Sequence, residues 1–407
     1  MREVMRNSAV RRILAAAAVS QVGDWAARLA IAFVVLDETG LASGVGVAGA
    51  LFFLPWLGPG QYLAAFGDQM DRVRLLFGCE LSRAVLYGLV ALGAGRAPVW
   101  VLLGMIAVVA VIDPVWESNR SALIVDVTSE AEYPDAVKVI HTANQTATLI
   151  GWGVGGLLVA SLGAGGTLGV NALTFLASAF LIGGVSTSGQ TLRTKRSGSF
   201  AAARAYLTRD RLSATALGVA ALLTVAGMAI ETQAPVFGRA VGLSEGWIGI
   251  MIAMIPLLTL ITVVFIPTKP GDRQLLSIGF GAAALAGAGA VAAFAAGGAD
   301  LVSFLGYGGV GIAFGASMVA NIVFGRRLPD TERAAIFSVV QGAIFISLSA
   351  GSLIGGLVSD IVGIREANVI FAIAITCVAG LGAVLSLRHV ERDSRKSIQG
   401  NLPTEFG

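Results

Sequence analysis

The sequence predicts an all-α membrane protein with twelve transmembrane helices, and three observations support this fold class. Of the 407 residues, 56% are hydrophobic and only 13% are charged, and the mean hydropathy is +0.80, too apolar for a soluble domain. Apolar runs of about 20 residues, enough to cross a hydrocarbon core of about 30 Å, recur along the chain. These runs lack the period-2 alternation of barrel strands, so helices must satisfy their backbone groups in lipid.

Short polar breaks separate the apolar runs, and each run is expected to form one helix. The first run follows Arg11 and Arg12 and shows no clear cleavage site, so we interpret it as a helix and not as a signal peptide. The twelve runs cover residues 13–36, 44–64, 75–94, 98–117, 137–160, 167–185, 213–235, 246–267, 275–297, 301–324, 335–359 and 367–387.

The basic residues predict the orientation. If the N-terminus is cytoplasmic, the inside segments hold 23 of the 28 Lys and Arg residues. The outside loops then hold Arg96, Arg239 and Arg365, whereas Arg28 and Arg83 lie within helices. This is a strong positive-inside pattern, so both termini are expected in the cytoplasm, and the net charge of +3 reflects topology and does not indicate a nucleic-acid partner. Arg outnumbers Lys 24 to 4, which fits a bacterium with a GC-rich genome and hence the bacterial cytoplasmic (inner) membrane.

The longest polar break, 186–212, divides the runs six and six and predicts a cytoplasmic linker. Two sequence echoes support this division. "GWGVGGL" at 151–157 is similar to "GSLIGGL" at 351–357, and "DRVRLL" at 71–76 is similar to "DRQLL" at 272–276. Repeated six-helix halves related by an axis along the membrane normal are a transporter architecture, with the substrate site between the halves. The predicted divisions are an N-terminal six-helix bundle (1–185), the cytoplasmic linker (186–212), a C-terminal six-helix bundle (213–387) and a cytoplasmic tail (388–407).

The break after the second run, "AAFGDQMDRVRLLFGCELSRA", resembles the loop 2-3 signature of the major facilitator superfamily, and especially its enterobactin-exporter and macrolide-efflux branch. Ala64, Gln69 and Val73 replace one Gly and two Arg of that signature. Further stretches resemble the same branch in the same order, so the similarity covers nearly the whole chain. They are "SQVGDW", "DPVWESNRSALI", "GWGVGGLLV" and "NALTFLASAF". The resemblance implies a major facilitator fold that works by alternating access.

The same resemblance implies a cytoplasmic gate in which Asp68 is the latch residue and faces the start of the eleventh helix. Acid-to-arginine bridges and an acid against a helix N-terminus are stabilising, so they can hold this face closed. Solvated loop charges that only direct topology are the alternative. The residues expected around the latch are Asp71, Arg72, Glu80, Arg83 and Arg120.

Ionisable residues inside the predicted helices are the candidates for proton coupling or substrate binding. Asp24 and Arg28 are spaced i,i+4, which places them on one helix face about 6 Å apart, where they can neutralise each other. A structural ion pair is one interpretation. Because ionisable groups at this depth are costly and usually face a watered cavity, a proton or substrate site is the other, with Asp24 as the leading candidate.

Three further residues are candidates for the same site. Asp113 precedes Pro114, which disturbs the helix hydrogen bonds, and it is either functional or structural. Glu231, near the outer end of the seventh run, is either a cavity-lining acid or an interfacial charge. Trp152 stands at the proline position of the G-P-x-x-G-G motif of efflux members and can offer an aromatic wall to an amphipathic ligand.

Glycines in two runs allow close helix contact, which suits interfaces that rock or slide, although ordinary tight packing has the same requirement. The candidate helix-packing hinge residues are Gly151, Gly155, Gly156, Gly351, Gly355 and Gly356.

The sequence shows no phosphate loop, metal-spaced His cluster or nucleophile elbow, so we expect no cofactor, no metal and no enzymatic activity. The preferred interpretation is a monomeric secondary transporter that exports an amphipathic small molecule, such as a drug, antibiotic or siderophore, in exchange for protons. A lipid or lysophospholipid flippase of the same fold is the first alternative, and a membrane-embedded acyl-transfer enzyme is a remote one.

Overall fold

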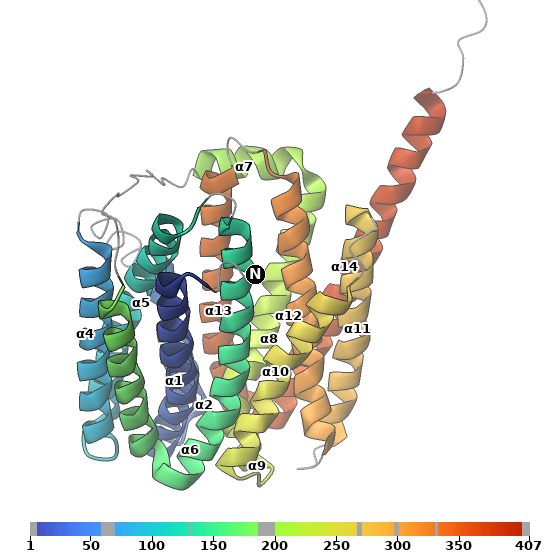
Figure 1. Ribbon diagram of the computed structural model, residues 1–407. Coiled ribbons are helices and arrows are strands. Elements are labelled where there is room, and N and C mark those ends of the chain that lie inside the picture. Colours follow the sequence, from blue (N-terminus) through green and yellow to red (C-terminus); the bar gives the residue numbers. More distant parts are fainter. Residues whose placement is uncertain are drawn as a thin grey trace, which may run out of the picture.

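The computed structural model describes residues 6–57, 70–129, 132–185, 200–266, 271–296, 301–329 and 333–400, and within these the chain is helical (Figure 1). Ten of the helices are long and apolar enough to cross a membrane. Seven of the long helices have bounds close to single predicted runs. They are α1 (Ser8–Thr39), α4 (Arg72–Gly93), α8 (Arg211–Thr232), α10 (Glu245–Phe265), α11 (Asp272–Ala296), α12 (Leu301–Arg327) and α13 (Arg333–Val362).

Two long helices extend well beyond their predicted runs. α5 (Val99–Val127) continues past residue 117, and α14 (Ile364–Gly400) continues into the predicted tail. Short helices connect or flank the long ones. They are α2 (Ala42–Leu51), the 3-10 helix η2 (Leu54–Leu57), α7 (Phe200–Arg209) and α9 (Ala234–Ala240). α7 lies in the predicted linker, of which residues 186–199 fall outside the described residues.

α6 (Tyr133–Gly183) contains both the fifth and the sixth predicted runs. The chain turns at Gly163, whose φ of 72° and ψ of 173° are non-helical and favour glycine. α6 is therefore a hairpin of two arms, as Figure 1 shows in green at the bottom of the view. The second predicted run, 44–64, is described as far as residue 57, where α2 and η2 occupy it. Each of the twelve predicted runs therefore corresponds to a long helix, to one arm of α6 or, for the second run, to α2 and η2.

Side-chain caps explain where several helices begin and end. The Asn7 side chain accepts a hydrogen bond from the Ala9 backbone N–H at 3.0 Å and starts α1, and Gly40, with φ 66°, ends it. Asp71 caps α4 through the Arg74 N–H, and Asp210 caps α8 through the Ser213 N–H. Both carboxylates also lie favourably at the positive end of a helix dipole.

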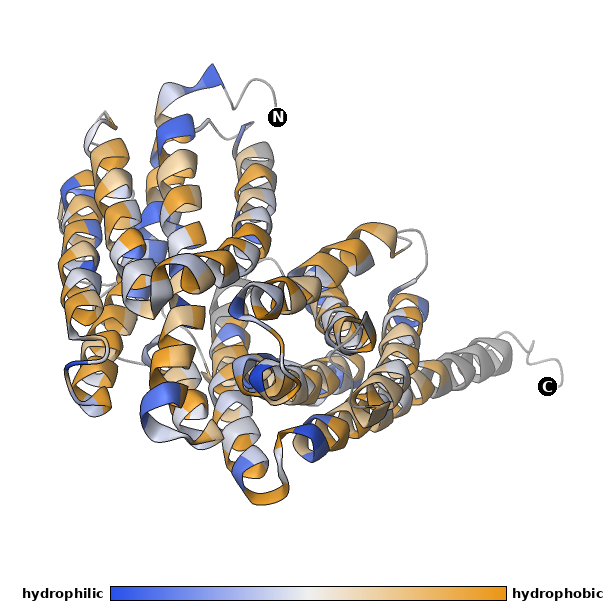
Figure 2. Cartoon of the chain, turned by 90° about the horizontal axis from the view of Figure 1, so that it is seen from below, coloured by the Kyte–Doolittle hydropathy of each residue, from blue (hydrophilic) through white to orange (hydrophobic). Residues whose placement is uncertain are grey.

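The helices pack in two groups, each with its own internal contacts. In the first group, α6 packs against α1 and α4, and α4 packs against α5. In the second, α8 packs against α12, α13 and α14, while α11 packs against α12 and α14. The extensive contacts between the groups are those of α6 with α10 and of α2 with α13. Hydrophobic residues follow the helices along their lengths (Figure 2), as a chain surrounded by lipid requires.

Candidate functional site

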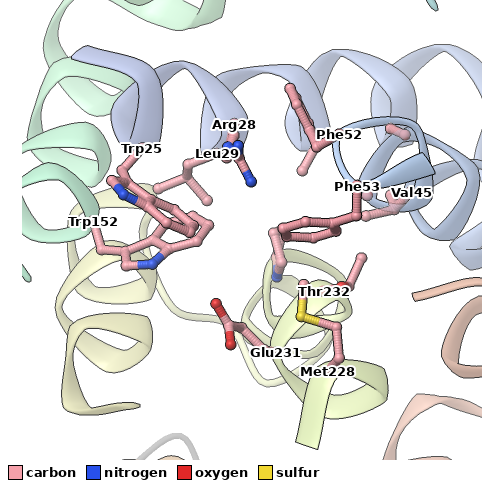
Figure 3. A pocket seen from close by; sticks show the side chains of 14 residues that line it. Trp25, Arg28, Leu29, Val45, Phe52, Phe53, Trp152, Met228, Glu231 and Thr232 are labelled. Carbon is pink, nitrogen blue, oxygen red and sulfur yellow. The ribbon is translucent and has the colours of Figure 1, made fainter. Parts of the chain in front are cut away.

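Two cavities lie along α1, and Arg28 lines both of them. The first, here called the aromatic cavity, lies between the two helix groups (Figure 3). Its walls come from α1, α2, α6 and α8 and the residues that follow α2 and α8. They are Trp25, Arg28, Leu29, Ala32, Val45, Ala48, Gly49, Phe52, Phe53, Trp152, Met228, Glu231, Thr232 and Pro235.

Arg28 lies in a cage of aromatic rings. Its guanidinium carbon is 4.5 Å from the ring centroid of Trp25, 4.4 Å from that of Phe52 and 5.2 Å from that of Phe53. Such cation–π contacts stabilise a guanidinium, and more strongly where it is removed from water. Among the described residues, no ion pair within 4.0 Å joins Arg28 to Asp24, one turn earlier on the same helix.

Glu231 and Trp152 also line the aromatic cavity, as the cavity-lining interpretation of both residues requires. The Trp152 ring packs against the Trp25 ring, with centroids 5.3 Å apart. Figure 3 shows the Glu231 carboxylate and the Arg28 guanidinium on different walls, contributed by α8 and α1. Within the described chain, Glu231 has no ion pair within 4.0 Å. The cavity thus holds one acid and one base that do not neutralise each other.

The second cavity, here called the polar cavity, lies on the side of Arg28 toward the start of α1. It contains three arginines and three acids. Its lining residues are Ala17, Ser20, Gln21, Asp24, Arg28, Trp56, Arg83, Asp113, Trp116, Glu117, Arg120 and Asn144. Asp24 has a buried Oδ1 atom with no hydrogen-bond partner. A buried carboxylate oxygen that lacks a hydrogen-bond partner is costly.

Asp113 differs from Asp24 because it has a cationic partner. Arg83 Nη1 donates to Asp113 Oδ1 at 3.2 Å, and Arg83 Nη2 lies 3.0 Å from Glu80 Oε1. Glu80 is fully buried and also accepts a hydrogen bond from Ser178 Oγ at 2.7 Å. The guanidinium of Arg83 lies over the Phe175 ring at 4.5 Å. These groups form one buried network that links α4, α5 and the second arm of α6.

The residues predicted around the cytoplasmic latch therefore divide into separate sites. Glu80 and Arg83 belong to the buried network with Asp113. Arg120 pairs with Glu117 one turn earlier on α5 and lines the polar cavity. Asp68 lies outside the described residues.

The other two gate candidates lie at the start of α4. Asp71 caps that helix, and Arg72 forms an ion pair with Asp126 near the end of α5. The sequence reasoning missed Asp126. The second helix group contains an equivalent contact of opposite polarity, because Arg327 at the end of α12 lies 3.2 Å from Asp272 at the start of α11. Arg72 lies in "DRVRLL" and Asp272 in "DRQLL", so the predicted internal repeat was the sequence signal for these two contacts.

Asp210 joins this second contact. Arg327 Nε donates to Asp210 Oδ2 at 2.7 Å, and Ser213 Oγ and Tyr206 Oη donate to the same oxygen at 2.7 and 3.0 Å. Partial burial raises the pKa of Asp210, but the hydrogen bonds from Arg327, Ser213 and Tyr206 outweigh it, so the net effect lowers this pKa below its usual range.

The six candidate glycines all lie at close helix contacts. A Cβ atom on Gly151 or Gly155 would lie 2.6 or 2.7 Å from atoms of α1, and one on Gly351 or Gly355 would lie 2.4 or 2.6 Å from backbone oxygens of α8. The third glycine of each motif instead meets the opposite helix group. Gly156 meets Gly249 of α10, and Gly356 meets Ala42 and Ser43 of α2.

Polar contacts between the groups lie at the same end of the molecule as these two glycine contacts. The Asp360 carboxylate of α13 accepts hydrogen bonds from the Ala42 and Ser43 N–H groups at 2.8 and 3.0 Å, and so caps α2 across the group boundary. Arg239 of α9 forms an ion pair with Asp37 of α1. The two groups are therefore held together at the end of α1 and the start of α2.

Among the residues that the structure describes, no cluster of three His, Cys, Asp or Glu side chains is placed to hold a metal ion.

Comparison with solved structures identifies the fold. A bacterial homologue of the human lysosomal transporter Spinster, in an inward-facing conformation, matches with a TM-score of 0.73 and 14% identity over 95% of this chain and 98% of that one. A bacterial homologue of the iron transporter ferroportin matches with a TM-score of 0.68 and 18% identity over 93% and 98% of the two chains. The nucleoside transporter NupG matches with a TM-score of 0.69 and 14% identity over 93% and 99%.

No protein-family model and no curated protein matches the chain. At these identities the matches establish the fold and not the substrate. The predicted all-α class and the major facilitator fold are confirmed.

Proposed function

We propose that this chain is a secondary transporter that works by alternating access and exports an amphipathic small molecule in exchange for protons. The observation that supports this most directly is Asp24, an acid within a membrane-spanning helix that lines a polar cavity without an ion-pair partner in the described chain. The solved structures of the same fold are named as transporters, which favours transport over acyl transfer.

Alternating access requires two bodies that separate at one end while they close at the other. The two helix groups are suited to this role, with residues 1–185 and 213–387 as the bodies. Their contacts at the Asp360 end are tight, because Gly156 and Gly356 bring backbones of the two groups together there. If the positive-inside orientation is correct, this closed end faces outward, and the polar cavity lies toward the cytoplasm.

Asp24 is the proposed proton carrier and Asp113 is not. A carrier must exist both with and without its proton during the cycle, and an acid held by a permanent cation is less able to do so. Asp113 is bound by Arg83, whereas Asp24 faces the same cavity without a bound cation. Protonated Asp24 would stabilise one access state, and its ionised form the other. Arg72, Asp71 and Asp68 remain the proposed cytoplasmic latch.

The aromatic cavity supports an amphipathic substrate. Trp25, Trp152 and the two phenylalanines after α2 offer flat apolar walls, and Arg28 and Glu231 offer charged groups among them. Such a mixture of apolar walls with a few polar groups is typical of small-molecule sites. The proposed outward direction of transport rests on the resemblance to the efflux branch. We also propose that the protein is a monomer in the bacterial cytoplasmic membrane.

Proteoliposomes with an imposed pH gradient test this function. The wild-type protein should move at least one member of a panel of siderophores, antibiotics and lysolipids in response to the gradient. Asp24→Asn should abolish gradient-driven movement but retain gradient-free exchange, because the amide resembles the protonated acid. Glu38→Gln, an exposed acid on the same helix, serves as the matched control. Normal proton-driven transport by folded Asp24→Asn protein would contradict proton coupling, and movement of lysolipid alone, indifferent to pH, would select a flippase.

A further inference from the structure

We propose that the substrate is a zwitterionic amphipath, with an anionic group that binds Arg28, a cationic group that binds Glu231, and an aromatic or apolar body between them. This inference rests on the proposed transport function and names the chemical class of its substrate.

The first reason is the state of Arg28. The buried arginines Arg72, Arg83 and Arg120 each have a carboxylate partner, so the chain elsewhere neutralises a guanidinium that it buries. Arg28 has three aromatic rings around it and a buried Nε atom with no hydrogen-bond partner. The rings orient the cation but accept no N–H···O hydrogen bond. A planar fork of donors directed into a cavity is suited to a carboxylate or phosphate group.

The second reason is the state of Glu231. Its carboxylate lines the same cavity and has no ion pair within 4.0 Å among the described residues. Met228, Pro235 and Trp152 contribute apolar surface to the same cavity. A carboxylate among apolar walls with no ion pair is stabilised when a cation binds to it, and an ammonium group on the substrate supplies that cation.

The third reason is the position of these charges. Arg28 belongs to α1 and Glu231 to α8, so the acid and the base come from the two helix groups that must move relative to each other. Trp25 and Trp152 form the wall beside them, with ring centroids 5.3 Å apart (Figure 3). A zwitterion of suitable length satisfies both charges at once and so connects the two groups. A ligand with one charge leaves the other residue unpaired.

A series of four compounds on one scaffold tests this. 4-(Aminomethyl)phenylacetic acid has an ammonium and a carboxylate on either side of a ring. Its N-acetyl derivative is an anion, its primary amide is a cation, and the doubly blocked compound is neutral. Calorimetric titration of each compound into the purified full chain should show the zwitterion binding about tenfold or more tightly than the other three, as a charge-assisted hydrogen bond on each side requires.

Variants then assign each charge. Arg28→Gln should bind the carboxylic acid and its primary amide equally well but still prefer the free amine to its N-acetyl derivative. Glu231→Gln should lose the preference for the free amine and still prefer the carboxylic acid to the amide. Leu222→Met changes an exposed, uncharged residue of the same helix that does not line the cavity, and it should keep the wild-type order of affinities. Thermal unfolding establishes that each variant is folded.

Equal binding of the four compounds, no binding of any of them to the wild type, or an unchanged order of affinities in either folded charge variant would overturn the proposal. These outcomes leave the transport function standing, because gradient-driven uptake and its dependence on Asp24 are measured separately with the other compounds. If gradient-driven uptake fails while the zwitterion still binds through both charges, the proposed transport function is contradicted. The proposed chemical class of the ligand then stands.

Discussion

Gly156 of α6 and Gly249 of α10 meet backbone to backbone, since a Cβ atom built on Gly156 would lie 2.8 Å from the Gly249 Cα atom. Real Cβ atoms essentially never come this close to another heavy atom. The contact joins the two helix groups at the end where Asp360 caps α2. A side chain at this position is therefore incompatible with the observed closure, although a conformation that is open at this end has room for it.

Gly156→Ala should shift the protein toward the conformation that is open at the Asp360 end. Spin labels at Leu41 and Ile361, which are exposed and belong to different groups, would report a longer distance in pulsed electron resonance. Cys377 is exposed and must first be replaced. Gly153→Ala is the matched control, because a Cβ atom there meets nothing within 4 Å. Equal distance distributions in folded Gly156→Ala and Gly153→Ala would show that this contact does not govern closure.

The Arg72–Asp126 ion pair should contribute more to stability than its counterpart in the second helix group. Its side chains are 8% and 13% exposed, against 35% and 29% for Arg327 and Asp272. Arg72→Ala leaves a nearly buried charge unpaired, which costs about 3–5 kcal/mol, whereas Asp272→Asn breaks a more exposed pair worth about 1 kcal/mol or less. Thermal unfolding in detergent measures both. Similar losses in the two variants would contradict this ranking.

Asp210→Asn should lower stability near neutral pH by about 0.5–1 kcal/mol, because the amide can still cap α8 but loses the negative charge that interacts with the helix dipole and with Arg327. Because the folded-state pKa of Asp210 is lowered, its contribution is present above the unfolded pKa of about 3.9 and disappears as pH falls through the folded value. The gap in melting temperature between variant and wild type should therefore narrow on acidification below about pH 4. A gap that is constant with pH would mean that Asp210 acts through shape and not through charge.

Asp113→Asn should reduce stability and leave proton coupling in place. The substitution removes a charged partner from Arg83, which is 4% exposed and retains Glu80. We expect a lower melting temperature with an unchanged number of protons exchanged per substrate molecule. Purification in lipid, with the stability measured beside the flux, separates the two effects. A stable Asp113→Asn protein without gradient-driven transport would transfer the proton-carrier role from Asp24 to Asp113.

The fold was largely predictable from the sequence because each membrane-spanning helix must bury its own backbone groups and so leaves a run of apolar residues. The exceptions have local causes. The fifth and sixth runs form one hairpin, since Gly163 reverses the chain without any polar loop. The second run breaks into α2 and η2 near Pro55, where the missing backbone donor and the restriction on Leu54 disfavour a continuous helix.

The candidate site was predictable only in part because its partners come from different helices. Asp24 and Arg28 share a helix face, so spacing alone predicts a pair, yet Phe52 and Phe53 from the segment after α2 form the cage that holds the guanidinium elsewhere. Trp25, three residues before Arg28, was visible as a helical neighbour. The grouping of Glu80 and Arg83 with Asp113 depends on how α4 packs beside α5, which sequence spacing does not encode.

The position of Arg28 between the two cavities gives the protein two barriers with different kinetics. The barrier between the aromatic and polar cavities includes a single side chain, and rotamer changes of a side chain take picoseconds to nanoseconds where space allows. The closure at the Asp360 end consists of backbone against backbone, so it opens only when whole helix groups move, on a scale of microseconds to milliseconds. Small species such as water should therefore equilibrate between the cavities many times before the closure at the Asp360 end opens once.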